Sequence, residues 1–146
     1  MRFQSTQASC GPAALRNALR ARGVTRSEDE LAQLCGFSPA TGTPVRGMLR
    51  ALALIAVDHP DITPAQLKES RPDIALLKLR DAHSHGLVVI LCVDSDEHWV
   101  VSFGSLGDRI HVADSDDDEM VLHYTPPELI ERWRGLGRAA FYGIVV

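Results

Sequence analysis

Helical patterns occupy the first half of this 146-residue chain, and strand patterns occupy the second half. In the first half, apolar residues recur every three or four positions, as on one side of an amphipathic helix. In the second half, β-branched runs alternate with glycine-containing turns. Helices followed by strands predict an α+β fold. We therefore expect an N-terminal helical layer packed on an antiparallel sheet.

Three helices are predicted in the first half. The first runs from about Cys10 to Arg22, because Pro12 is tolerated only in a first helical turn and Gly23 ends the pattern. Its arginines, Arg16 among them, fall outside the apolar stripe. The remaining signals are a capping box at Ser27–Glu30 for a helix that ends at Gly36, Thr43-Pro44 for a third helix, and Thr63-Pro64 for a short fourth helical turn.

Five segments are predicted as strands, and one late helix interrupts them. Leu87–Val93 is apolar on both faces, which is typical of a central strand. The other predicted strands are Ile74–Leu79, His98–Gly104, Arg109–Asp114 and Ala140–Val146, and a short helix is predicted from Thr125 to Trp133.

Composition excludes several classes of protein. Hydrophobic residues make up 45% and charged residues 23%, as in an ordinary soluble domain, and we expect one domain over residues 1–146. The net charge is −4 and the arginines are scattered, which argues against a nucleic-acid partner. The longest apolar run is seven residues, far short of the roughly 20 that cross a bilayer. With no signal-peptide pattern at the N-terminus, we expect a cytoplasmic protein.

Cys10 is the candidate nucleophile. The chain has three cysteines and no CxxC pair, so neither a disulfide framework nor a structural zinc site is expected. Cys10 lies at the start of the first predicted helix, where the helix dipole favours the reactive thiolate. Gly11 leaves the space beside the sulfur free of a side chain, and we expect a substrate carbonyl to use it. A buried, inert cysteine is the alternative.

His98 and Asp114 are the candidate partners of Cys10. A hairpin turn centred near Leu106 places these two residues opposite each other, with their Cβ atoms about 5 Å apart. A carboxylate on one ring nitrogen would orient the other nitrogen toward a thiol. The alternative is a surface histidine beside a solvated aspartate.

The other histidines and the acidic run are not predicted to bind a metal. We expect His83 and His85 to lie in a solvated turn, His123 to follow a strand, and His111 to lie on the face opposite Asp114. The run Asp114–Glu119 lacks the glycine that a calcium loop requires at its sixth position. A solvated acidic turn is therefore predicted, and neither a metal nor a cofactor is expected.

Gln4 lies six residues before Cys10 and is the candidate oxyanion donor, beside the N–H of Cys10 itself. Spacing alone leaves Gln7 as an alternative oxyanion donor.

These pieces together resemble the papain-like cysteine peptidases, and most of all their C39 branch of bacteriocin-leader-processing peptidases. The resemblance lies in Gln4, the segment Cys10-Gly-Pro, the segment His98-Trp-Val-Val, and Asp114 16 residues after the histidine. It implies a papain-like fold and a Cys-His-Asp triad. Cys10 would be the nucleophile, His98 the base and then the acid, Asp114 the orienting residue, and Gln4 the oxyanion donor.

The expected function is a thiol hydrolase that cleaves a peptide or isopeptide amide through a thioester, with a peptide or protein as substrate. One alternative is another acyl transfer on the same triad: deamidation, transpeptidation or effector-type modification. A different class is a binding module that keeps the fold and does no chemistry. The sequence predicts no oligomeric state.

Overall fold

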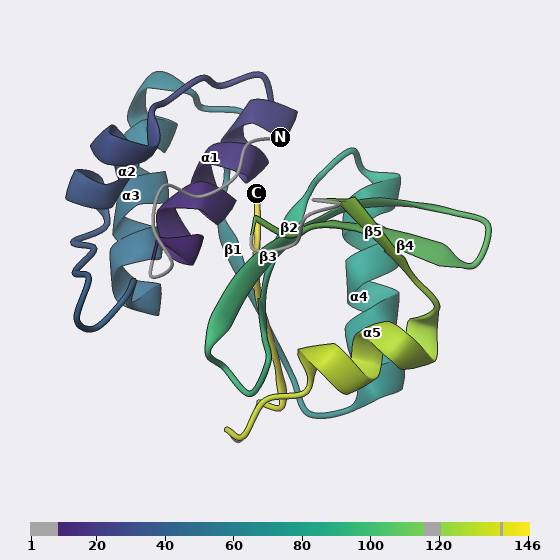
Figure 1. The fold of residues 1–146 in the computed structure, drawn as a ribbon. Coiled ribbons are helices and arrows are strands. Elements are labelled where there is room, and N and C mark those ends of the chain that lie inside the picture. Colours follow the sequence, from purple (N-terminus) through teal and green to yellow (C-terminus); the bar gives the residue numbers. More distant parts are fainter. Residues whose placement is uncertain (1–8, 116–120, 138) are drawn as a thin grey trace.

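The computed structural model describes residues 9–115, 121–137 and 139–146. In this part of the chain, an antiparallel sheet in the order β1-β6-β2-β3-β4-β5 lies between two groups of helices (Figure 1). Helices α1 to α3 lie on one side of the sheet, and α4 and α5 lie on the other. The elements are α1 (Cys10–Ala21), α2 (Glu28–Leu34), α3 (Val45–Asp58), β1 (Ala65–Glu69), α4 (Pro72–Ser84), β2 (Val89–Val93), β3 (His98–Leu106), β4 (Arg109–Ala113), β5 (Val121–Tyr124), α5 (Pro126–Trp133) and β6 (Phe141–Val145).

The predicted α+β fold is confirmed, and so are the first three helices. The Ser27 side chain caps α2 by accepting a hydrogen bond of 3.1 Å from the backbone N–H of Glu30. One side chain of α1 differs from the prediction. Arg16 is buried rather than outside the apolar stripe, and it forms an ion pair with Glu28 of α2.

Two predicted elements are wrong, and both lie between residues 63 and 84. The run Ile74–Leu79 is not a strand but the middle of α4. Pro72 begins this helix, and its buried residues Ala75, Leu79 and Ala82 recur at helical spacing. The predicted helical turn at Thr63-Pro64 instead precedes β1, which pairs along its whole length with β6. Because α4 is a helix, the sheet is covered on both faces rather than by one helical layer.

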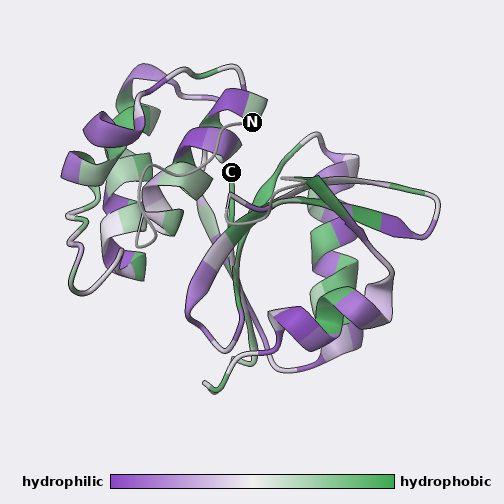
Figure 2. Ribbon diagram, viewed as in Figure 1, coloured by the Kyte–Doolittle hydropathy of each residue, from purple (hydrophilic) through white to green (hydrophobic). Residues whose placement is uncertain are grey.

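Two hydrophobic cores fill the two spaces between the sheet and the helices. One lies against α1 to α3 and includes Leu15, Ile90 and Trp99, whereas the other lies against α4 and α5 and includes Leu91, Val100 and Trp133. Figure 2 shows apolar residues along the central strands and in stretches of the helices beside them. All five residues of β2 are buried, so the prediction of a central strand is confirmed.

The β3–β4 hairpin was predicted, but its register is different. Its turn is centred on Gly107 and Asp108, with Leu106 paired to Arg109, and an irregularity near Ser102 shifts the pairing by one residue. Ala113 pairs with Val101, so Asp114 comes next to the position of Val100 rather than opposite His98. His98 and Val100 share a face of β3, so His98 approaches Asp114 diagonally across the two strands.

Candidate active site

Cys10 is the first residue of α1 and opens into a cleft with a volume of about 620 Å³. Residues 39–43, in the loop between α2 and α3, line one side of this cleft. The turn between β2 and β3 lines the other side with Asp94, Asp96 and Glu97. His98 and Trp99, the first residues of β3, also line it. The cleft thus places a thiol, an imidazole and an acidic wall around one space.

Gly11 is needed for packing rather than for the space predicted beside the sulfur. A Cβ atom on Gly11 would collide with the side chain of Thr43, one of the cleft residues. The missing side chain therefore allows the α2–α3 loop to close against the start of α1. The expectation that a substrate carbonyl uses this space is wrong, because Thr43 fills it.

His98 and Asp114 meet directly, although the predicted register was wrong. Nε2 of His98 lies 2.7 Å from Oδ1 of Asp114, and only 10% and 4% of these side chains are exposed. A carboxylate only accepts hydrogen bonds, so Nε2 is the donor. This bond leaves Nδ1 of His98 for its other partner.

The Cys10 side chain is that other partner, since His98 also forms a hydrogen bond with it. Burial alone would lower the pKa of His98. The hydrogen bonds to Asp114 and Cys10, together with the charges of those two groups, outweigh burial and raise the pKa to about 10. His98 is therefore an imidazolium at neutral pH and lies between a thiol group and a carboxylate.

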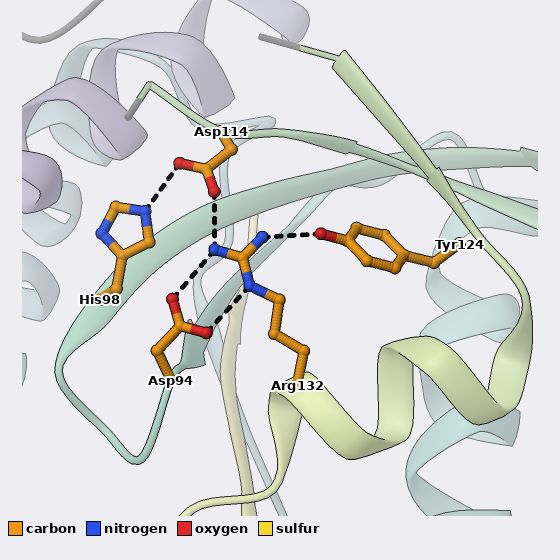
Figure 3. A network of polar contacts seen from close by, with 5 residues as sticks. All are labelled: Asp94, His98, Asp114, Tyr124 and Arg132. Atoms are coloured by element: carbon orange, nitrogen blue, oxygen red, sulfur yellow. Dashed lines mark hydrogen bonds and ion pairs between the residues drawn. The ribbon is translucent and has the colours of Figure 1, made fainter. Parts of the chain in front are cut away.

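Arg132, which the sequence did not indicate as a site residue, binds the oxygen of Asp114 that His98 does not contact (Figure 3). One of its terminal nitrogens (NH2) donates to Oδ2 of Asp114 at 2.6 Å, and the same guanidinium binds both oxygens of Asp94. The available signal was an arginine one residue before Trp133 in the predicted late helix. Its partners are distant in sequence, so no local pattern could have identified them.

The remaining predicted residues fall into two groups. Gln4, Gln7 and residues 116–119 of the acidic run lie outside the described residues. His83 lies in the last turn of α4 and not in a solvated loop: its Nε2 is 3.1 Å from the Ser102 hydroxyl, and burial lowers its pKa. His123 lies within β5 rather than after a strand, paired with His111.

Within residues 9–115, 121–137 and 139–146, no three His, Cys, Asp or Glu side chains are grouped so as to hold a metal ion. In the same ranges, no helix has both the length and the apolar character needed to cross a bilayer.

Comparison with solved structures identifies the fold. The peptidase domain of Streptococcus ComA, described as a bi-functional ABC transporter involved in quorum sensing, superposes with a TM-score of 0.73 and 18% identity, over 99% of this chain and 96% of that domain. A putative C39-like peptidase from Bacillus anthracis gives a TM-score of 0.71 at 12% identity, over 100% and 94%. A double-glycine-motif protease from an AMS/PCAT transporter, solved with a leader peptide, gives 0.67 at 16%, over 97% and 86%. The chain has the papain-like fold of C39 peptidase domains.

Comparison of sequences gives one relative. An uncharacterized protein of Methanothermobacter marburgensis is 36% identical over 91 residues, which are 62% of this chain and 62% of the relative. The chain therefore matches less than two thirds of that protein's length. No protein-family model matches the sequence.

Proposed function

We propose that this chain is a thiol peptidase that cleaves a peptide amide through a thioester. The observation that supports the proposal most is the continuous line of hydrogen bonds from Cys10 through His98 to Asp114 at one cleft. The C39 fold adds support, since one solved neighbour is a protease held with a leader peptide. In this proposal the substrate is likewise a peptide, and it lies between the α2–α3 loop and the β2–β3 turn.

The chemistry assigns one role to each side chain. The Cys10 thiolate attacks the amide carbon, and the bond between carbon and sulfur forms as the carbonyl electrons move to oxygen. When the carbonyl re-forms, the carbon–nitrogen bond breaks and His98 gives its proton to the leaving amine. A water then attacks the thioester while neutral His98 accepts the proton of that water. The carbon–sulfur bond breaks, and the acid product leaves.

Two further groups complete the proposal. Asp114 orients the imidazole and stabilises it when it is charged. The backbone N–H of Cys10, at the start of α1, and the side chain of Gln4 are the proposed donors to the oxyanion. Gln4 enters on its spacing from Cys10 alone, which is six residues.

The proposal is tested first by labelling. Brief iodoacetamide treatment followed by mass spectrometry should modify Cys10 far faster than Cys35 or Cys92. Cys10 is partly exposed, whereas Cys35 and Cys92 are buried, and burial raises the pKa of both. Equal labelling of the three thiols would remove the case for an activated Cys10.

Turnover is tested with p-nitrophenyl acetate, a general thiol-acylating ester, and with a peptide library. Cys10→Ala should abolish both the initial burst of p-nitrophenol and the steady-state release, and His98→Ala should lower the steady-state rate by about 10²- to 10⁴-fold. Ser84→Ala, an exposed change at a residue that does not line the cleft, is the control and should behave as wild type. Wild-type protein that shows no more burst than Cys10→Ala would favour the peptide-binding module instead.

A further inference from the structure

Arg132 is held by partners from three different parts of the chain (Figure 3). One terminal nitrogen (NH2) donates to Asp114 at 2.6 Å and to Asp94 at 2.9 Å, and Nε donates to the second oxygen of Asp94 at 3.0 Å. The other terminal nitrogen (NH1) donates to the hydroxyl of Tyr124 at 2.8 Å. A planar guanidinium that is bonded on all three sides has one orientation.

Asp94 also ties Arg132 to the wall of the cleft. Its backbone N–H donates to the carbonyl oxygen of Arg132 at 3.0 Å, so the two residues are joined through both backbone and side chains. Asp94, Ser95 and Asp96 all have left-handed φ angles, between 54° and 69°, which are costly for residues other than glycine. Asp96 is held in turn by the backbone N–H of Leu136, at 2.9 Å. The end of α5 thus supports the strained turn that lines the cleft.

The position of Arg132 on Asp114 matters because the charge of His98 changes during the proposed reaction. Asp114 is buried, and a buried carboxylate beside an uncharged imidazole tends to take up a proton. A protonated Asp114 would donate to Nε2 of His98 and shift the ring proton to Nδ1. Nδ1 is the nitrogen that faces Cys10, and it could then no longer accept a proton from water. The guanidinium keeps its charge throughout, because its bonds to Asp94 and Asp114 raise its pKa despite burial.

We propose that Arg132 is a positioning residue for the water-attack step: it keeps Asp114 ionised and oriented while His98 is uncharged. The inference rests on the proposed thiol-peptidase function and adds to it a residue that acts through Asp114. It predicts that loss of Arg132 impairs hydrolysis of the acyl-enzyme more than its formation. Acyl-enzyme formation from an activated ester starts with His98 charged, when Asp114 already faces a cation.

The experiment separates these two steps with p-nitrophenyl acetate, whose burst reports acylation and whose steady state reports hydrolysis. Arg132→Met should keep the burst rate within about threefold of wild type and lower the steady-state rate about 10- to 100-fold. The acid limb of its steady-state pH profile should move to higher pH. Arg132→Lys, which keeps the charge, should recover most of the loss. Arg134→Met is the matched control: Arg134 lies two residues further along and stacks over Phe141, and its loss should change neither phase.

A double-mutant cycle tests whether Arg132 acts through Asp114. Asp114→Asn should slow hydrolysis by itself, and adding Arg132→Met should cause little further loss. Additive losses, or equal loss of burst and steady state with unchanged pH limbs, would overturn the proposal and leave Arg132 a structural residue. Should Arg132→Met fail to fold by circular dichroism, Arg132→Gln, which removes the charge but keeps a polar side chain, must show the same split. The absence of that split would also overturn the proposal. A wild-type protein without a burst would instead contradict the proposed function itself.

Discussion

At the scale of single residues, His98 is the residue of the candidate site that links the thiol to the carboxylate. Its ring is bonded to Asp114 through Nε2 and to Cys10 on the other side, and these contacts outweigh the effect of burial on its pKa. The imidazolium therefore persists well above the pH at which a free histidine loses its proton, up to about pH 10. One interaction, with the Asp114 carboxylate, can be removed without changing the size of the side chain.

Asp114→Asn should lower the pKa of His98 below the wild-type value of about 10. The amide removes a negative charge 2.7 Å from Nε2, so burial, which favours the neutral ring, gains weight. Titration of the His98 ring by NMR measures this directly. Asp81→Asn, next to exposed His85, is the control and should leave the His98 titration unchanged. Identical His98 midpoints in wild type and Asp114→Asn would show that Asp114 does not hold the imidazolium.

At the scale of elements, the sequence predicted the features that depend on residues close together in the chain. Helix α1 was predicted because Pro12 and Gly23 mark its ends, and α2 because Ser27 supplies its cap. β1 was missed because it exists only through pairing with β6, about 75 residues further along the chain. The meeting of His98 with Asp114 was expected, but the register behind it was wrong, since the hairpin turns at Gly107 and Asp108 rather than near Leu106. Arg132 was missed because the two carboxylates that it binds, Asp94 and Asp114, lie 38 and 18 residues away in the sequence.

Helix α4 gives the sharpest test at this scale, since Leu77 and Leu79 would share a face in the predicted strand. In the helix they point in different directions: Leu77 is 65% exposed and Leu79 is fully buried. Leu79→Ala should lower the free energy of unfolding by about 2 to 5 kcal/mol, whereas Leu77→Ala should change it by no more than about 0.5 kcal/mol. Urea denaturation followed by circular dichroism measures both. Similar losses for the two variants would favour the strand.

At the scale of the whole molecule, the sheet lies between the two cores. The candidate site combines residues from the helices on both sides with a residue of the sheet. Cys10 comes from the helical layer of α1 to α3, His98 from the central strand β3, and Arg132 from α5 on the opposite side. The geometry of the site therefore depends on both layers being docked at once. Adjacent residues of β3 face opposite cores, as Val100 and Val101 do. Because both cores pack on this strand, we expect a substitution that destabilises one core to destabilise the other as well.

The two tryptophans allow this dependence to be measured, because each lies in one core: Trp99 on the α1 side and Trp133 on the α5 side. Trp133→Phe leaves Trp99 as the only fluorescent reporter of its kind, and Trp99→Phe leaves Trp133. In each background, Leu15→Ala, which cuts a fully buried side chain of α1, should destabilise the protein by about 2 to 5 kcal/mol. Because the cores share strands, we expect it to lower the urea midpoint reported by either tryptophan by the same amount. A shift seen by Trp99 but not by Trp133 would mean that the helical layer unfolds separately. Cys10 could then leave His98 while the sheet stays folded.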